Sequence, residues 1–407
     1  MNNPRLSASP RARRHARGMS LIELMIAGTI GLLVVLAVTG SVMTMGRQFS
    51  ILGSNATAQS SAQIGISLID AAGRAAGAGF YNNGKSICST WNAYNGTAVV
   101  ADNGVLMPVR ITAGASGTVS DTITFTAGGG SHPLSSLPVL EAASGNSIKV
   151  TDAGNIAAGD LAVIGVPGST TVPCTLFQVI GAPTTAASCG GNAPSCRVLV
   201  RNPNNGLNPN PTDFTTTPTY GYDTAGSTVG PAVVSRIGTS AGGFRQDAFA
   251  VQCNALVRYN AFTTTTVPAC TANPLAFGTG VDAVATDIVM LQAQYGISAS
   301  AADNVVASWV EPTGTWASPA AGDVARIKAI RVVLVARSRD AEGTQISAPC
   351  TNAASVANTG PCSFQDAAAP VIDLSGLALP TGKTWRNYRY RVHKAVIPLR
   401  NVIWSNS

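Results

Sequence analysis

One segment near the start of the chain constrains the fold more than any other. Residues 24–46 contain no charged side chain and are rich in leucine, isoleucine and valine. A helix needs roughly 20 predominantly apolar residues to cross the hydrocarbon core of a bilayer. No other stretch of this 407-residue chain meets that requirement. The sequence therefore predicts a single membrane span at about 21–46.

The positive charge of the chain is concentrated in front of this span. The formal net charge is +7, and Arg5, Arg11, Arg13, Arg14 and Arg17 precede the span without an acidic neighbour. Without these arginines the basic and acidic residues nearly balance, so the net charge is not the footprint of a nucleic-acid-binding surface. Positive residues mark the cytoplasmic side of a span. We therefore expect a cytoplasmic N-terminus, with the chain after Arg47 in the periplasm.

The junction between the basic and apolar segments resembles a known leader. Residues 18–26 read Gly-Met-Ser-Leu-Ile-Glu-Leu-Met-Ile, and this string is similar to the type III leader of type IV prepilins and pseudopilins. The resemblance implies cleavage between Gly18 and Met19, N-methylation of Met19, and Glu23 as the fifth mature residue. Two features depart from the pattern: Met19 stands where phenylalanine is commoner, and the mid-helix proline of many major pilins is missing.

Glu23 is the single charged residue between Met19 and Gly46. A carboxylate at the centre of a span costs roughly 2.5–3.5 kcal/mol, while each Leu, Ile or Val contributes about −0.3 to −0.6 kcal/mol. Insertion therefore stays favourable. By the resemblance, this glutamate offsets the terminal amine of a neighbouring subunit during assembly. The alternative is an acid tolerated at the membrane interface.

The helix is expected to continue beyond the membrane. Ala62, Ile66, Ile69 and Gly73 recur at helical spacing and define one apolar face. From about residue 80 the pattern changes to short β-branched runs separated by Gly, Pro, Asn and Thr, which is typical of strands and turns. The predicted fold class is α+β and pilin-like, with a long N-terminal hydrophobic helix packed on a β-rich, loop-rich head. The predicted divisions are a leader at 1–18, the helix at 19–79 and a periplasmic head at 80–407, with an elaboration at about 88–250.

Four further segments resemble the PilW family of type IV pilus minor pilins. Residues 285–296 are interpreted as a short helix leading into a strand, and 327–339 and 388–400 as two long strands. Residues 74–80 (RAAGAGF) complete the set. The resemblance covers about the first 80 residues and the last 130, whereas the central region matches no family that we can name.

The resemblance implies a minor pilin that helps to prime pilus assembly at or near the tip, in support of twitching, adhesion or DNA uptake. The implied partners are prepilin peptidase, the inner membrane, other minor pilins, the major pilin and a PilY-type tip adhesin. The implied location is the inner membrane as a single-pass protein, and then the pilus at the cell surface. A J-type pseudopilin of type II secretion is the alternative within the superfamily.

The eight cysteines predict disulfide bonds, because an even number in a periplasmic domain is typical of oxidised pairs. Closeness in sequence favours Cys253 with Cys270 and Cys350 with Cys362. The other four cysteines stay unassigned. A zinc site is disfavoured, since the chain has no CxxC motif and only three histidines. We expect no metal and no cofactor.

Two motifs of catalytic proteins occur, and neither has its required context. Residues 79–86 satisfy the P-loop pattern, but a helix precedes them and no helix is predicted after them. Residues 238–242 satisfy the GxSxG pattern around Ser240, but a turn and a strand are predicted next, and His393 lies in a strand. We therefore expect no enzyme, and a membrane-anchored periplasmic serine hydrolase is the alternative from another class.

The last predicted strand carries a candidate basic interaction face. Arg389, Arg391 and His393 alternate with less polar residues, which places them on one side of a strand. A solvated face is the simpler interpretation. The alternatives are contact with an acidic partner subunit, an anionic surface or DNA, and DNA binding would weaken steeply with salt.

Overall fold

The structure is a computed structural model in which two compact units are distinguished, Met1–Gly53 and Ser54–Ser407. Helix α1, Leu21–Ala75, contributes to both units. The residues that the structure describes are 20–82, 85–114, 118–129, 136–141, 143, 146–187, 189, 195–215, 218, 220, 232–239, 243–264, 277 and 279–404.

The first unit, as far as it is described, is the apolar part of α1. This helix is long and apolar enough to cross a membrane, and the side chains of its most apolar stretch are not buried. The expectation of one long apolar N-terminal helix is confirmed. The helix ends at Ala75 rather than at 79, because Gly77 and Gly79 adopt the left-handed backbone (φ 78° and 85°) that terminates helices.

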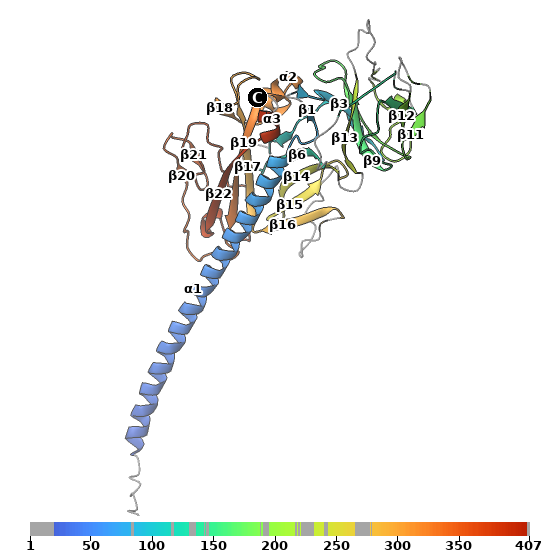
Figure 1. Cartoon of the computed structure of the whole chain (residues 1–407). Helices are drawn as coiled ribbons and strands as arrows, with labels where there is room; N and C mark the ends of the chain where they lie inside the picture. Colours follow the sequence, from blue (N-terminus) through green and yellow to red (C-terminus); the bar gives the residue numbers. More distant parts are fainter. Residues whose placement is uncertain are drawn as a thin grey trace, which may run out of the picture. The chain divides into compact units, whose positions relative to one another are not determined.

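The second unit begins with the remainder of α1, which packs on two antiparallel sheets (Figure 1). We call them sheet I, in the order β18-β17-β19-β22, and sheet II, in the order β16-β15-β14-β6-β5. The strands of sheet I are β17 (Ile288–Ile297), β18 (Ser308–Val310), β19 (Ile327–Arg337) and β22 (Tyr390–Pro398). The strands of sheet II are β5 (Val109–Thr112), β6 (Thr122–Gly128), β14 (Phe244–Gln252), β15 (Ala255–Asn260) and β16 (Val281–Thr286).

Small residues on α1 allow the helix to approach both sheets closely. Ala58, Ala62, Gly65, Ile69 and Gly73 are buried at spacings of three and four residues, so they form one face. A Cβ on Gly65 would lie 2.9 Å from Leu256 of sheet II and 3.1 Å from Leu334 of sheet I. The same helix face therefore contacts both sheets, and the main hydrophobic core lies between them and α1.

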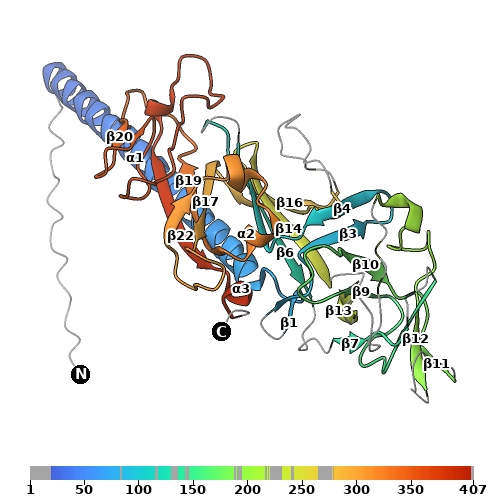
Figure 2. The ribbon, with the colours of Figure 1, turned by 90° about the horizontal axis from the view of Figure 1, so that it is seen from above.

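Two further sheets are built mainly from the central region. Figure 2 shows sheet II between sheet I and these strands. Sheet III has the order β4-β3-β10-β9-β13-β7, and sheet IV the order β11-β12-β8. Their strands are β3 (Thr90–Tyr94), β4 (Val99–Val105), β7 (Leu137–Pro138), β8 (Ser147–Val150), β9 (Asp160–Gly165), β10 (Cys174–Gln178), β11 (Thr184–Ala186), β12 (Cys196–Val200) and β13 (Val233–Thr239).

Short elements complete the described fold. Two hairpins pair β1 with β2 and β20 with β21. The bounds are β1 (Tyr81–Asn82), β2 (Lys85–Ser86), β20 (Cys350–Thr351), β21 (Ala357–Asn358), η2 (Pro211–Asp213), η3 (Gly314–Ala317), η4 (Trp385–Asn387), α2 (Ala321–Val324) and α3 (Arg400–Trp404).

The helix predicted at the start of residues 285–296 is wrong. Strand β16 runs to Thr286, and β17 begins at Ile288 after one residue, Asp287, with φ 61°. Every residue of β17 is buried because sheet I is covered on both faces, so the segment has no alternation that would identify it as a strand.

A buried carboxylate lies at the junction between sheets I and II. The Asp121 side chain accepts hydrogen bonds from the backbone N–H groups of Gly114 (2.9 Å) and Ala293 (2.8 Å). Burial raises the pKa of Asp121 to about 6, against the opposing effect of these two hydrogen bonds. The segment before β6 is thereby fixed to β17.

We predict that Gly73→Val destabilises the second unit. A Cβ at position 73 would lie 2.6 Å from Cγ2 of Ile397 and 3.3 Å from Cε1 of Phe125, so the helix or β22 must shift. Overpacking of this kind costs about 1–3 kcal/mol. Thermal unfolding of the full chain in detergent micelles, followed by circular dichroism, measures the loss.

The matched control is Gly53→Ala, because a Cβ at that helical glycine meets nothing within 4 Å. This control should be as stable as the parent or more stable by up to about 1 kcal/mol. Equal melting temperatures for Gly73→Val and the parent would contradict the packing described above.

Candidate functional site

The predicted processing site is described only in part. Gly18 and Met19 lie outside the described residues. Glu23 lies in the first turn of α1, where its side-chain oxygen accepts a hydrogen bond from the backbone N–H of Ser20 at 3.1 Å. A negative side chain is favourable at a helix N-terminus, where backbone N–H groups have no partner within the helix. The structure thus gives Glu23 a local role in starting the helix, and the role in processing and assembly stays a prediction.

Three disulfide bonds are described in the head, and one of them joins segments 86 residues apart. Cys350 is bonded to Cys362, the pair that closeness in sequence favours. Cys88 is bonded to Cys174 and Cys189 to Cys196, which resolves the four cysteines left unassigned. Cys253 is also disulfide-bonded. Its predicted partner, Cys270, lies outside the described residues, so that pairing stays a prediction.

The candidate basic face carries less charge than the sequence suggests. Arg391 and His393 lie on the same side of β22, opposite Ala336 and Leu334 of β19. Arg389 precedes the strand, and its Nε donates to Oε1 of Glu342 at 3.0 Å. Burial, together with the charge of Arg391, holds the pKa of His393 below its ordinary value of 6.5, so this imidazole adds less positive charge than a free histidine would. Of the three groups, only Arg391 is an exposed cation without a described ion pair.

The two catalytic motifs lack their required context in the described residues. In the P-loop match, Tyr81 pairs with Ser86 in the antiparallel hairpin β1–β2, whereas a P-loop opens a helix. Residues 83–84 of this match are not among the described residues. Ser240 of the GxSxG match also lies outside it, between β13 and β14. Within the described ranges, no group of three or more His, Cys, Asp or Glu side chains could hold a metal ion.

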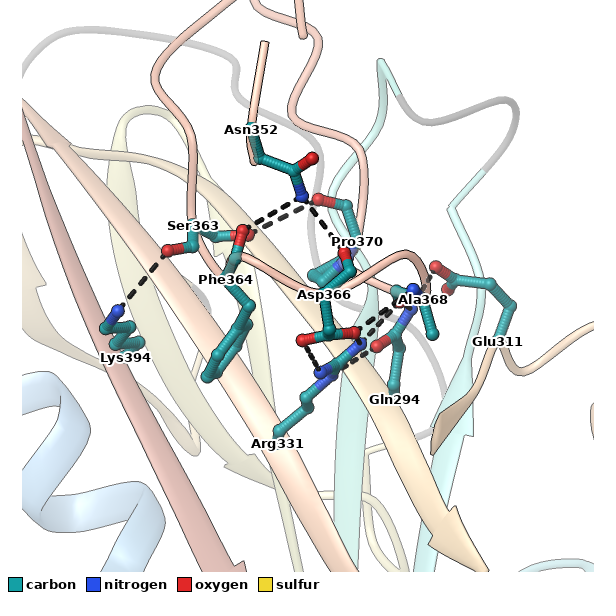
Figure 3. Close-up of polar contacts among 10 residues, drawn as sticks. All are labelled: Gln294, Glu311, Arg331, Asn352, Ser363, Phe364, Asp366, Ala368, Pro370 and Lys394. Atoms are coloured by element: carbon teal, nitrogen blue, oxygen red, sulfur yellow. Dashed lines mark hydrogen bonds and ion pairs between the residues drawn. The ribbon is translucent and has the colours of Figure 1, made fainter. Parts of the chain in front are cut away.

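The most tightly connected polar site centres on Arg331, which sequence reasoning missed. Arg331 lies in the middle of β19, and its side chain is 2% exposed. Its guanidinium donates to both carboxylate oxygens of Asp366, at 2.8 and 3.1 Å, and also to the side-chain oxygen of Gln294 and the carbonyl of Ala368. Figure 3 shows these groups converging from β17, β19 and the segment after β21.

Aromatic rings and backbone contacts complete this site. We call it the Arg331 cluster, and its members are Gln294, Trp309, Arg331, Asn352, Phe364, Asp366 and Ala368. The guanidinium carbon lies 4.7 Å from the ring centroid of Phe364 and 5.0 Å from that of Trp309, so the buried cation makes two cation–π contacts. The side-chain amide of Asn352 donates to the carbonyls of Phe364 and Asp366, which holds this segment in place (Figure 3). The cluster therefore fastens the segment around Asp366 to the face of sheet I that lies away from α1.

The pKa values of two acidic side chains at the cluster, Asp366 and Glu311, shift in opposite directions. The hydrogen bond from Arg331 is the largest cause that holds the pKa of Asp366 below its ordinary value of 3.8. Burial raises the pKa of the neighbouring Glu311, whose side chain accepts a hydrogen bond from Gln294. The position of Arg331 in the middle of the apolar run IKAIRVVLVAR was a signal of a buried charge in the sequence, but it did not reveal the partner, which lies 35 residues further on.

These features define a class of protein: one long apolar helix, able by length and composition to cross a membrane, followed by a disulfide-bonded, β-rich α+β head. Residues 237–401 match the model of the PilW family, described as type IV pilus-assembly protein W. The resemblance to this family is therefore confirmed over these residues, which include all of sheet I and β14–β16 of sheet II. No curated protein and no solved structure matches the chain.

We predict that Asp366→Asn lowers the stability of the full chain. Arg331 is buried and would lose its counter-charge, but Asp366 is 47% exposed, so solvent replaces part of the interaction. The expected loss is about 1–3 kcal/mol at pH 7. In the folded chain the pKa of Asp366 is below its ordinary value of 3.8. The stabilisation by the ion pair is therefore fully present above pH 3.8, and it is lost as the pH falls through the lower pKa of the folded state.

Melting temperatures of the parent and Asp366→Asn, measured in detergent micelles between neutral pH and about pH 3, test this prediction. The difference between the two should shrink on the acid side. The control Asp152→Asn makes the same chemical change at an exposed residue and should match the parent. A difference that is constant with pH, or equally large in the control, would refute the role of the ion pair.

Proposed function

We propose that this protein is a minor pilin, a structural subunit that helps to prime assembly of a type IV pilus at or near its tip. The observation that carries the proposal is the PilW match over residues 237–401 in a chain that begins with an apolar helix. The proposed partners are prepilin peptidase, other minor pilins, the major pilin and a PilY-type tip adhesin. The proposed path leads from the inner membrane to the pilus at the cell surface.

The apolar part of α1 supports a role in two different environments. Leu24, Leu33 and Leu36 are each more than 60% exposed, and so are several of their apolar neighbours. Exposed apolar surface of this extent requires cover by lipid or by other proteins. In the proposed function, lipid covers it before assembly, and the helices of neighbouring subunits cover it in the pilus.

The disulfide bonds support a head located outside the cytoplasm. Disulfides persist in oxidising compartments such as the periplasm. The Cys88–Cys174 bond closes a separation of 86 residues, and Cys350–Cys362 lies within the segment that the Arg331 cluster fastens. In the chain-entropy account, closing such loops contributes about 3–5 kcal/mol each. The central sheets are thereby stabilised although they share little apolar core with α1.

The first test is the intact mass of the protein extracted from membranes of a peptidase-competent host. We expect a chain that starts at Met19, lacks residues 1–18 and carries one added methyl group. In the matched variant Gly18→Leu, the side chain added before the cleaved bond should block processing, so residues 1–18 should remain. Retention of the leader in the parent chain would refute the prepilin assignment.

The second test separates a pilus role from a secretion role. Deletion of the protein should reduce surface piliation and leave exoprotein release unchanged, and the intact chain supplied from a plasmid should restore piliation. A Glu23→Ala chain should restore less piliation, because the acid proposed to offset the neighbouring terminal amine is missing. Lost exoprotein release with normal piliation would instead favour a J-type pseudopilin.

A further inference from the structure

A cavity of about 360 Å³ lies between sheet II and the β3–β4 edge of sheet III. Small-molecule sites typically occupy about 300–1,000 Å³, with a few convergent polar groups on a largely apolar surface. The volume of this cavity lies within that range, and its lining combines apolar side chains with a few polar ones. Its walls include Trp91 of β3 and most of β4.

The floor of the cavity is a polar patch on sheet II. Arg110 of β5 pairs directly with Thr124 of β6, and Thr126 of β6 pairs directly with Gln246 of β14. Side chains two residues apart on a strand share a face, so all four side chains lie on one side of the sheet. The opposite side of these strands carries Ile111, Ile123, Phe125 and Phe249, which pack in the core with α1.

The polar groups of the floor have weak internal contacts. The guanidinium of Arg110 donates to the carbonyl of Val105 at 3.4 Å, and the Gln246 amide donates to the Thr126 hydroxyl at 3.5 Å. Both distances are at the long limit for hydrogen bonds. The floor contains no acidic residue, and the one acid on the wall, Asp102, accepts three hydrogen bonds from Thr215. The floor therefore carries one positive charge and several hydrogen-bond donors, and the negative charge of Asp102 lies on the wall, where Thr215 binds its carboxylate.

We propose that this cavity binds a hydroxylated carboxylate the size of a monosaccharide, with a hexuronate as the simplest example. The planar guanidinium of Arg110 can bind a carboxylate through two parallel hydrogen bonds. The hydroxyls of Thr124 and Thr126 and the amide of Gln246 can exchange hydrogen bonds with ring hydroxyls. The apolar walls cover the faces of the sugar ring. This activity is separate from pilus assembly and does not depend on it.

The test is isothermal titration of the purified full chain in detergent micelles with D-glucuronate, with D-glucose as the neutral probe. We expect saturable binding of glucuronate in the micromolar to millimolar range and much weaker binding of glucose. Arg110→Gln should lower the affinity for glucuronate by about tenfold or more, because a charge-assisted pair is lost. Thr124→Val keeps the shape of the side chain and removes one hydroxyl, so it should lower the affinity by a smaller factor.

The matched control is Arg245→Gln. Arg245 precedes Gln246 and so points to the other side of β14, with a side chain that is 50% exposed. This variant should bind glucuronate as the parent does. No saturable binding of glucuronate, equal binding of glucose, or an affinity that Arg110→Gln leaves unchanged would each overturn the proposal.

Since Arg110 is exposed, its replacement should not prevent folding, and circular dichroism checks this directly. Failure here leaves the piliation test unaffected.

Discussion

The close packing of α1 on sheets I and II is the contact on which the head depends. Each of these sheets has an apolar face, and the small residues from Ala58 to Gly73 let one helix cover parts of both. Larger residues would hold the helix away from the strands and leave the apolar side chains in contact with fewer atoms. The same helix continues into the apolar segment proposed to lie in the membrane. One helix therefore supplies both that apolar segment and part of the core of the head.

The other face of sheet I is covered in a different way. A long segment between β19 and β22, with little regular structure of its own, lies over this face and contributes Ile372, Leu374 and Trp385 to an apolar cluster. A loop of this length needs additional restraints, because few backbone hydrogen bonds define its path. The Cys350–Cys362 bond and the Arg331–Asp366 pair provide them. A buried charge is strongly destabilising without its partner, so the segment has one favoured register on the sheet.

Prediction from sequence succeeded where the signal is local and continuous. The apolar helix and the change to a β-rich head could be predicted from residue type and spacing alone. The start of β17 was misassigned, because a strand buried on both faces shows no alternation. The lowered pKa of His393 could not be predicted, because its partial burial depends on neighbours distant in sequence. The cavity floor could not be predicted. Arg110 and Gln246 lie on different strands, and the pairing of both strands with β6 places their side chains on the same face.

The sequence by itself determined the long apolar helix, the β-rich class of the head and the presence of disulfide bonds. These properties follow from the apolarity, periodicity and composition of neighbouring residues, which act over one helical turn or one strand. The tertiary structure alone decided which residues became sites. Packing of the segment after β21 on sheet I placed Arg331 beside Asp366, partial burial lowered the pKa of His393, and strand pairing assembled the polar floor of the cavity from three strands. Interactions of this kind depend on distance in space, and chain order does not specify that distance until the sheets have formed.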